Sequence, residues 1–278
     1  MKVLEVENLT KTYPAFSLGP LSFSLEEGVI TGFIGRNGAG KTTTIKSLLN
    51  LISSDGKIKF FGKDLKTSEE EIKQNIGYAV GGTSYYVRKK IKDVIAVTKT
   101  FYPEWNDELC ESYLKEFSLD KEKRIRELSE GMKVKFSLTL ALSHGAKLLI
   151  LDEPTSGLDP VSREELTEIF LSLAKRGVTI LFSTHVTEDL DACAERIIYI
   201  KKGKIIANST YKEFVDSYRL VRLKDTDDKS RFIGVCSDKD GATGLIKADQ
   251  EKDFCDREVL RPGVRDIMIH LEKEKIYD

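Results

Sequence analysis

Residues 148–159, LLILDEPTSGLD, constrain the fold of this chain most strongly. Four aliphatic residues run without alternation into two adjacent carboxylates, Asp152 and Glu153. A short continuous apolar run is typical of a strand buried on both faces, as in a parallel sheet covered by helices. Ligands of open α/β sheets bind at the carboxyl ends of the strands, where these two acids stand. The pair is suited to hold a metal ion and to orient a water molecule.

A second motif, GRNGAGKT at Gly35–Thr42, matches the phosphate-loop pattern G-x-x-x-x-G-K-[ST] in full. It follows an expected strand, VITGFI, and opens an expected helix, which is the context that the motif requires. The glycines let backbone amides surround phosphate groups, and the helix adds its positive N-terminal end. Lys41 is placed to reach the β- and γ-phosphates, and the Thr42 hydroxyl is placed to ligate Mg²⁺. The loop predicts a nucleoside triphosphate site.

The two motifs together assign roles to the paired acids. With a triphosphate in the loop, Asp152 is expected to be the acidic partner in the Mg²⁺ shell. Glu153 points to the other side of an extended chain and is expected to act as the general base toward water. An apolar or amide residue in its place would have indicated a module that only binds nucleotide.

Composition excludes several classes of protein. The chain has 44 Lys and Arg against 45 Asp and Glu, so its net charge of −1 gives no indication of nucleic-acid binding. No stretch approaches the roughly 18 uninterrupted apolar residues of a membrane span, and the opening segment lacks the apolar core of a signal peptide. The scattered cysteines, without a CxxC pair, predict reduced thiols in a cytoplasmic protein, with neither a disulfide framework nor a zinc site. They are Cys110, Cys193, Cys236 and Cys255.

Strand and helix patterns divide the chain into regions. Residues 2–7 and the segments that end at Gly28 and Gly35 predict early strands, with residues 10–20 as a turn-rich connection. From about 85 to 145 strand signals almost vanish, which predicts a helical insertion. Strands then alternate with helices, as in a parallel sheet with crossover connections. After about Arg219, three short strand patterns and a closing helix predict a small α+β appendix.

Three smaller motifs complete the pattern. LSEGM at Leu128–Met132 precedes a long apolar helix, with Ser129 placed as its N-cap. SGLD at Ser156–Asp159 follows the paired acids at a short distance. His185 closes the strand TILFSTH at another carboxyl end of the sheet, where a side chain can meet a γ-phosphate.

In this order and spacing the motifs resemble the nucleotide-binding subunit of ABC (ATP-binding cassette) transporters, over residues 1 to about 215. The resemblance implies an ATPase that uses ATP and Mg²⁺. Its implied catalytic residues are Lys41, Glu153 and His185, and its implied metal ligands are Thr42 and Asp152. Its implied nucleotide contacts are Tyr13 (stacked on adenine), Gly35, Asn37, Gly38, Ala39, Gly40, Lys41, Thr42 and Thr43. Ser129, Gly131 and Asp159 are implied to meet the ATP of a second subunit.

The resemblance also implies fold, partners and location. The expected fold class is α/β, with domain 1–218 and accessory domain 219–278. Domain 1–218 is a P-loop NTPase core with a mainly parallel sheet, an antiparallel β subdomain and an inserted helical subdomain at about 85–145. Two subunits are expected to face head to tail, with ATP between the phosphate loop of one and the LSEGM motif of the other. The implied partner is an integral-membrane permease, which places the chain in the cytoplasm, peripheral on the inner face of the membrane.

Two motifs depart from the family pattern. Gly81 stands where the family commonly has a glutamine that touches Mg²⁺ and water, with Ser84 nearby as a candidate substitute. Glu130 and Met132 replace the common glycine and glutamine of the LSEGM motif. Because a second negative charge near a polyphosphate is unfavourable, Glu130 is expected to point toward solvent.

The LSxGM form, the FYPEWN stretch at Phe101–Asn106 and the appendix resemble a subgroup that works with ABC-2-type permeases in Gram-positive bacteria. That subgroup exports peptides or antimicrobials, or confers immunity to them. Two alternatives remain. A soluble ATPase acting on ribosomes or DNA is disfavoured by the single cassette and the absence of sustained heptads. A regulatory subunit that binds ATP without hydrolysing it is disfavoured by Lys41, Glu153 and His185 but favoured by Gly81 and Glu130.

Overall fold

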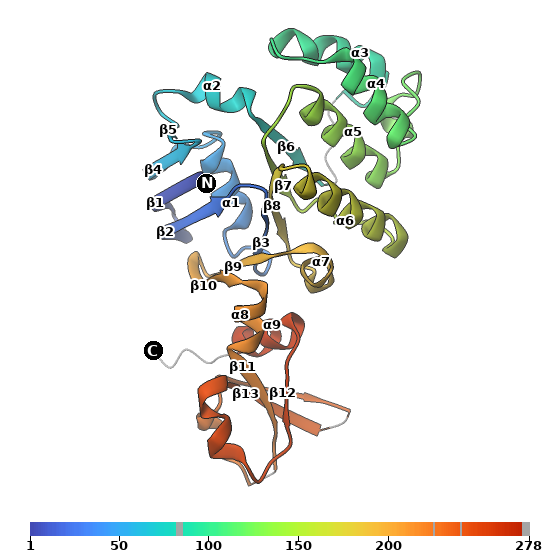
Figure 1. Cartoon of the computed structure of the whole chain (residues 1–278). Helices are drawn as coiled ribbons and strands as arrows, with labels where there is room; N and C mark the ends of the chain where they lie inside the picture. Colours follow the sequence, from blue (N-terminus) through green and yellow to red (C-terminus); the bar gives the residue numbers. More distant parts are fainter. Residues whose placement is uncertain (82–85, 225, 240, 274–278) are drawn as a thin grey trace. The chain divides into compact units, whose positions relative to one another are not determined.

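The computed structural model describes residues 1–81, 86–224, 226–239 and 241–273 (Figure 1). It divides into two compact units, Met1–Ile206 and Ala207–Asp278. The predicted domain boundary at 218/219 lies later than this division, which falls inside β10 (Lys204–Thr210). Thr210 ends that strand and also caps the following helix, so the chain passes from one unit to the next without a linker.

A six-stranded sheet with strand order β10-β9-β3-β8-β7-β6 organises the first unit. The strands β6, β7, β8, β3 and β9 pair in parallel. Every residue of β3, β7 and β8 is buried, which for β7 confirms the prediction from its unbroken aliphatic run. The bounds are β3 (Ile30–Ile34), β6 (Ile76–Val80), β7 (Leu148–Asp152), β8 (Thr179–Thr184) and β9 (Arg196–Lys201).

A second, antiparallel sheet has the order β2-β1-β4-β5. Its strands are β1 (Lys2–Tyr13), β2 (Phe16–Glu26), β4 (Asp55–Phe60) and β5 (Lys63–Asp64). The turn-rich connection predicted for residues 10–20 is wrong in extent, because β1 and β2 continue pairing to Tyr13 and Phe16 and leave only Pro14 and Ala15 as the turn. Cross-strand pairing along the whole hairpin overrides the local Gly and Pro signals.

One hydrophobic core joins the two sheets through α1 (Lys41–Leu48). Ile45 and Leu48 of this helix are fully buried, together with residues of the antiparallel sheet and one face of the parallel sheet. The other face of the parallel sheet packs on α6 (Pro160–Lys175), where the rings of Phe170 and Phe182 lie 5.8 Å apart. Figure 1 shows α1 on the side of the antiparallel sheet and α5 and α6 on the opposite side.

The predicted helical insertion contains α3 (Ile91–Thr98), α4 (Asp107–Glu116) and α5 (Glu130–Ser143), with short 3₁₀ turns at Lys99–Phe101 and Ile125–Glu127. The FYPEWN stretch connects these helices. Its Tyr102 ring stacks on His144 with centroids 3.8 Å apart, and its Asn106 caps α4 by accepting a hydrogen bond from the Leu109 amide. The remaining helices of this unit are α2 (Glu69–Gln74) and α7 (Thr187–Cys193).

The second unit is a small α+β structure. Its antiparallel sheet has the order β12-β13-β11-β14, and Val221, Phe232, Ile246 and Phe254 form its core. The strands are β11 (Tyr218–Arg222), β12 (Gly234–Asp238), β13 (Gly241–Lys247) and β14 (Val259–Leu260). The helices are α8 (Tyr211–Asp216) and α9 (Val264–Lys273), with 3₁₀ turns at Lys229–Arg231 and Ala248–Phe254. None of the helices in the described ranges is long and apolar enough to cross a membrane.

Candidate nucleotide-binding site

The carboxyl ends of four parallel strands meet at one edge of the first unit's parallel sheet. Val80 of β6 is paired with Asp152 of β7, Asp152 with Ser183 of β8, and Thr184 with Ile34 of β3. The register therefore places the paired acids, His185 and the start of the phosphate loop side by side. This arrangement confirms the expectation that the acids stand at a common sheet edge with the loop.

The phosphate loop leads from β3 into α1 and borders a cavity of about 710 Å³. Gly40 precedes the helix with φ 114°, a left-handed conformation, and a Cβ there would lie 2.6 Å from the Leu18 side chain. Most of the predicted loop residues line the cavity, whereas Gly35 and Ala39 are buried behind it. The lining residues are Tyr13, Ala15, Phe16, Arg36, Asn37, Gly38, Gly40, Lys41, Thr42, Thr43, Glu153, Ser156 and His185.

The Lys41 amino group lies at the centre of this cavity's polar wall. It donates hydrogen bonds to the carbonyl oxygens of Gly35 (2.7 Å) and Arg36 (3.3 Å), and it pairs with Glu153 Oε1 at 3.0 Å. The Lys41 side chain is 5% exposed, so this ion pair is shielded from solvent on the lysine side. The buried Lys41 ammonium group thus contacts both the loop backbone and Glu153.

Glu153 connects Lys41 with His185. Its other oxygen, Oε2, lies 2.7 Å from His185 Nδ1. Glu153 has φ 52°, a left-handed conformation that is unfavourable for a residue with a side chain. The strained turn directly after β7 directs the carboxylate into the cavity, where it meets both partners.

Asp152 occupies a different environment from its neighbour. It is 3% exposed, and its Oδ1 accepts a hydrogen bond of 2.6 Å from the Ser183 hydroxyl. The same hydroxyl accepts a hydrogen bond of 3.0 Å from the Glu153 amide. Ser183 therefore ties the two adjacent acids to β8, which sequence reasoning missed because the serine belongs to a strand about thirty residues away.

Tyr13 stands at the end of β1 on the rim of the cavity. Its ring is 39% exposed, and the Lys11 amino group lies 5.5 Å from the ring centroid. An exposed aromatic ring on a cavity rim is free to stack on a flat base, which fits its predicted role. Phe16, which sequence reasoning missed, lines the same end of the cavity from the start of β2.

Ser129, Gly131 and Asp159 are not among the residues that line this cavity. Ser129 Oγ accepts a hydrogen bond from the Met132 amide and caps α5, as its position predicts. Asp159 caps α6 through the amides of Val161 and Ser162. Hydrogen bonds from the Ser162 hydroxyl and these amides hold the pKa of Asp159 below its ordinary value.

The expectation that Glu130 points toward solvent is wrong in part. Its side chain is 40% exposed, and its Oε1 pairs with Lys133 at 2.7 Å. Its Oε2, however, is buried and has no hydrogen-bond partner among the described residues. The ion pair to Lys133, one turn further along α5, turns the carboxylate along the helix rather than outward.

Gly81 approaches the paired acids more closely than any residue with a Cβ can. Its amide donates a hydrogen bond of 2.8 Å to the Asp152 carbonyl oxygen, and an added Cβ would lie 1.9 Å from the Glu153 carbonyl oxygen. A glutamine at this position is therefore incompatible with the present backbone. Ser84, the candidate substitute, lies outside the described residues.

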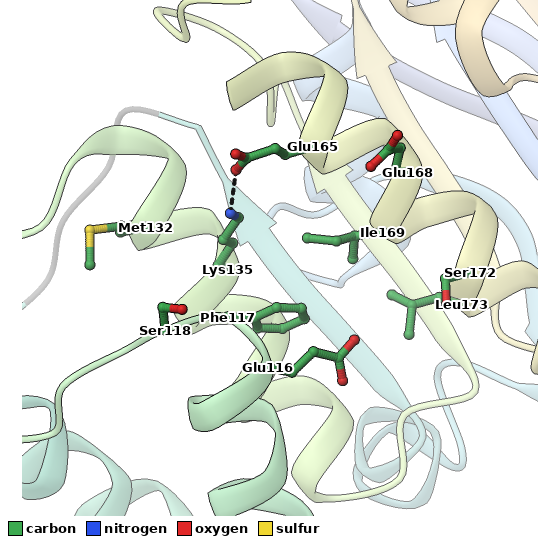
Figure 2. Close-up of a pocket in the computed structure, with 10 residues that line it drawn as sticks. All are labelled: Glu116, Phe117, Ser118, Met132, Lys135, Glu165, Glu168, Ile169, Ser172 and Leu173. Atoms are coloured by element: carbon green, nitrogen blue, oxygen red, sulfur yellow. Dashed lines mark hydrogen bonds and ion pairs between the residues drawn. The ribbon is translucent and has the colours of Figure 1, made fainter. Parts of the chain in front are cut away.

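A second cavity, of about 620 Å³, lies between the helical insertion and α6 (Figure 2). Figure 2 shows Lys135 of α5 bonded to Glu165 of α6 across it, above the Phe117 ring. None of the predicted catalytic, metal or phosphate-loop residues lines this space, so the nucleotide site is the cavity at the sheet edge.

Comparisons with known proteins agree with this geometry. Residues 18–156 match the family model for ABC transporters. The chain is 29% identical to the bacitracin transport ATP-binding protein BcrA of Bacillus licheniformis, over 98% of this chain and 87% of that protein. It is 32% identical to the uncharacterized ABC transporter ATP-binding protein YhaQ of Bacillus subtilis, over 87% of this chain and 85% of that protein.

A solved structure of an ATP-binding subunit of an ABC transporter superposes on this chain with a TM-score of 0.68 and 27% identity. The match covers 76% of this chain and 91% of that one. The chain therefore has both the fold of an ABC ATP-binding subunit and the sequence motifs that resemble this family. The chain belongs to the ABC transporter family, in which it is an ATP-binding subunit and an ATPase.

Proposed function

We propose that this subunit hydrolyses ATP with Glu153 as the general base and drives a separate integral-membrane permease that exports peptides or antimicrobial compounds. The observation that carries the hydrolytic part is the Glu153 carboxylate, which contacts Lys41 and His185 at 3.0 Å and 2.7 Å in one cavity. Phosphoryl transfer to water needs a group that orients or deprotonates the water and a cation for the γ-phosphate, and His185 here holds the base in place.

In the proposed reaction Glu153 accepts a proton from water as the water oxygen attacks the γ-phosphorus. The bond between that phosphorus and the bridging oxygen breaks, which releases ADP and inorganic phosphate. Lys41 neutralises charge on the phosphate oxygens. Because its amino group is paired with Glu153, the bound triphosphate must compete with that carboxylate for Lys41. His185 holds the carboxylate in position and faces the γ-phosphate from β8.

The residues present fit a magnesium ion. Thr42 contributes a hydroxyl at the cavity wall and Asp152 a buried carboxylate below it, and both are oxygen donors of the kind that Mg²⁺ prefers. Mg²⁺ is commonly held by one or two protein groups together with phosphate oxygens and water, so a larger protein ligand cluster is not required. When bound, the ion supplies positive charge against the phosphates.

Ser129, Gly131 and Asp159 support a head-to-tail pair of subunits. They do not reach the chain's own cavity, although each stands at or next to the N-terminus of a helix. A helix N-terminus attracts phosphate, so the start of α5 suits the γ-phosphate of ATP held by a second copy or a related subunit.

The permease is supported by an exposed apolar row on the helical insertion and by the names of the relatives. Val97 and Phe101 are 54% and 68% exposed and lie four residues apart in the sequence. Exposed apolar side chains of this kind are suited to pack against a cytoplasmic segment of a membrane protein, which would hold the subunit at the inner face of the membrane. BcrA, by its name, serves bacitracin transport. We propose a peptide substrate for the permease partner because this chain is similar to BcrA.

The test is affinity purification of the tagged subunit from detergent-solubilised membranes of its native cells. A multispanning membrane protein is expected to accompany it, and cells with the Lys41→Ala chain are expected to lose tolerance of exported peptides. Val97→Asp combined with Phe101→Asp should release the membrane protein, whereas Leu51→Asp, at another exposed apolar position, should retain it. Recovery of ribosomes or DNA in place of a membrane protein would contradict the proposal.

A further inference from the structure

A buried carboxylate, Asp189, connects the segment that follows Glu153 with the segment that carries His185. It lies on α7, four residues after His185, and its side chain is fully buried. Its Oδ2 accepts a hydrogen bond of 2.6 Å from the Thr155 hydroxyl and one of 2.8 Å from the Thr184 hydroxyl. Thr155 follows Glu153 by two residues, and Thr184 directly precedes His185.

The Thr184 hydroxyl passes this constraint to the backbone around His185. It accepts a hydrogen bond of 2.9 Å from the Val186 amide while it donates to Asp189. The backbone on both sides of His185 is therefore fixed through one hydroxyl, whose orientation the carboxylate sets. Glu153 and His185 contact each other at 2.7 Å. Asp189 Oδ2 therefore holds the segment that follows Glu153 and the segment that carries His185.

The second oxygen of Asp189 faces the helix that begins after the SGLD motif. Its Oδ1 lies 3.4 Å from Arg163 Nε of α6, and neither atom has a hydrogen-bond partner among the described residues. Burial raises the pKa of Asp189 above its ordinary value, so the carboxylate is held at an energetic cost. An apolar residue of similar size would fill a purely structural position at less cost.

We infer that Asp189 is a positioning residue for ATP hydrolysis, which sets the geometry between Glu153 and His185 through the Thr155 and Thr184 hydroxyls. It is fully buried and does not line the nucleotide cavity, so it acts only through the two segments. This inference rests on the proposed roles of Glu153 and His185. It predicts that loss of the carboxylate slows turnover while ATP binding, which depends on the phosphate loop, is retained.

The experiment measures kcat and KM for ATP, together with the melting temperature, for Asp189→Asn in the full-length chain. We expect kcat to fall about tenfold or more with KM changed less than about twofold, because a misplaced base slows chemistry without loosening the loop. Glu188→Gln, an equal charge change on an exposed neighbour in α7, should behave as wild type. Wild-type kcat in Asp189→Asn, or equal losses in kcat and ATP affinity, would overturn the inference.

Threonine variants separate positioning from a general structural role. Thr155→Val and Thr184→Val remove only the hydroxyls, and each should lower kcat without a matching rise in KM. Added to Asp189→Asn, either threonine change should have little further effect on kcat, because all three variants disturb the same hydrogen bonds between Asp189 and the threonine hydroxyls. Additive losses would contradict this. If Asp189→Asn does not fold, the threonine variants alone decide, and wild-type kcat in both would sink the inference.

Glu153→Gln is measured in parallel, so that failure of the proposed function can be recognised. Turnover in Glu153→Gln at the wild-type rate would remove the assigned base and with it the premise. Loss of turnover in Glu153→Gln together with wild-type kcat in Asp189→Asn would overturn only the positioning role.

Discussion

Gly81 occupies the position at which the resemblance to the ABC family leads us to expect a glutamine. Its missing side chain lets the end of β6 reach the turn after β7, where Glu153 holds its left-handed backbone. The Gly81 amide bonds the Asp152 carbonyl, so the close approach also completes the ladder between the two strands. The glycine therefore supports the strained turn that aims the catalytic carboxylate.

Gly81→Ala tests this close approach. The added Cβ would meet the Glu153 carbonyl oxygen at 1.9 Å, so the backbone must move. We expect the free energy of unfolding to fall by about 1–3 kcal/mol, the usual range for overpacking, and ATP turnover to fall with it. Urea unfolding and steady-state ATPase assays measure both quantities. Gly263→Ala is the control, because its Cβ meets nothing closer than 3.7 Å; equal behaviour of the two variants would contradict the prediction.

At the scale of elements, the helical insertion is held to the core by the stretch 101–106 and the end of α5. Asn106 caps α4, and its amide donates a hydrogen bond to the Ser143 carbonyl at the end of α5. His144 follows α5, stacks on Tyr102 and bonds the Gln74 carbonyl oxygen through Nδ1. The stretch that resembles a subgroup marker thus has a structural role in this chain.

Asn106→Ala removes the side-chain cap of α4. Because the Leu109 amide then loses its partner, we expect the free energy of unfolding to fall by about 1 kcal/mol with little change in ATP affinity. Chemical denaturation followed by circular dichroism measures the change. Ser112→Ala, on the exposed part of the same helix, should remain within about 0.5 kcal/mol of wild type. A larger loss for Ser112→Ala than for Asn106→Ala would refute the capping role.

His144 makes stability depend on pH. Burial lowers its pKa below the ordinary value, because the folded protein disfavours the charged imidazole. Below the unfolded-state pKa of about 6.5 the unfolded chain binds more protons than the folded one, so stability falls as pH falls toward the folded pKa. Above about pH 6.5 this contribution is fully present.

Urea unfolding at pH 7.5, 6.5 and 5.5 checks this dependence. His144→Gln removes the titrating group and should lose less stability than wild type between the upper and lower pH. Because carboxylates titrate in both proteins, the difference between the two slopes reports His144. Identical slopes would show that the imidazole does not contribute.

At the scale of the whole molecule, the residues that we expect to contact nucleotide fall into two groups on the first unit. The phosphate loop, Glu153 and His185 border one cavity, while Ser129, Gly131 and Asp159 stand outside it. A single copy therefore lacks contacts that the family pattern assigns to ATP, and pairing with another subunit would supply them. ATP binding and association of subunits are then coupled by mass action.

Glu153→Gln tests that coupling in the full chain. Without the base, bound ATP is not consumed, so the ATP-bound pair should accumulate. We expect a dimer in size-exclusion chromatography with ATP and Mg²⁺, a monomer without nucleotide, and ATP turnover reduced at least a hundredfold. Glu153→Gln combined with Ser129→Arg should stay monomeric with ATP. A dimer of equal amount with and without ATP would contradict the coupling.

Features that depend on neighbouring residues could be predicted from residue order. The phosphate loop, the buried strand that ends in two acids and the helix cap at Ser129 all rest on spacing and on local hydrogen bonds. These follow from residue order alone, because the interacting groups lie within a few residues of each other.

Contacts between distant segments could not be predicted in this way, because they form only when the chain is folded. The bridging Ser183, the Asp189 carboxylate, the inward turn of one Glu130 oxygen and the need for glycine at 81 depend on which strands and helices become neighbours. Local periodicity reveals which face of a strand is buried but not which strand lies beside it. The chemistry of the acids was therefore readable from the chain, whereas the groups that hold them in place became visible only once the sheet was assembled.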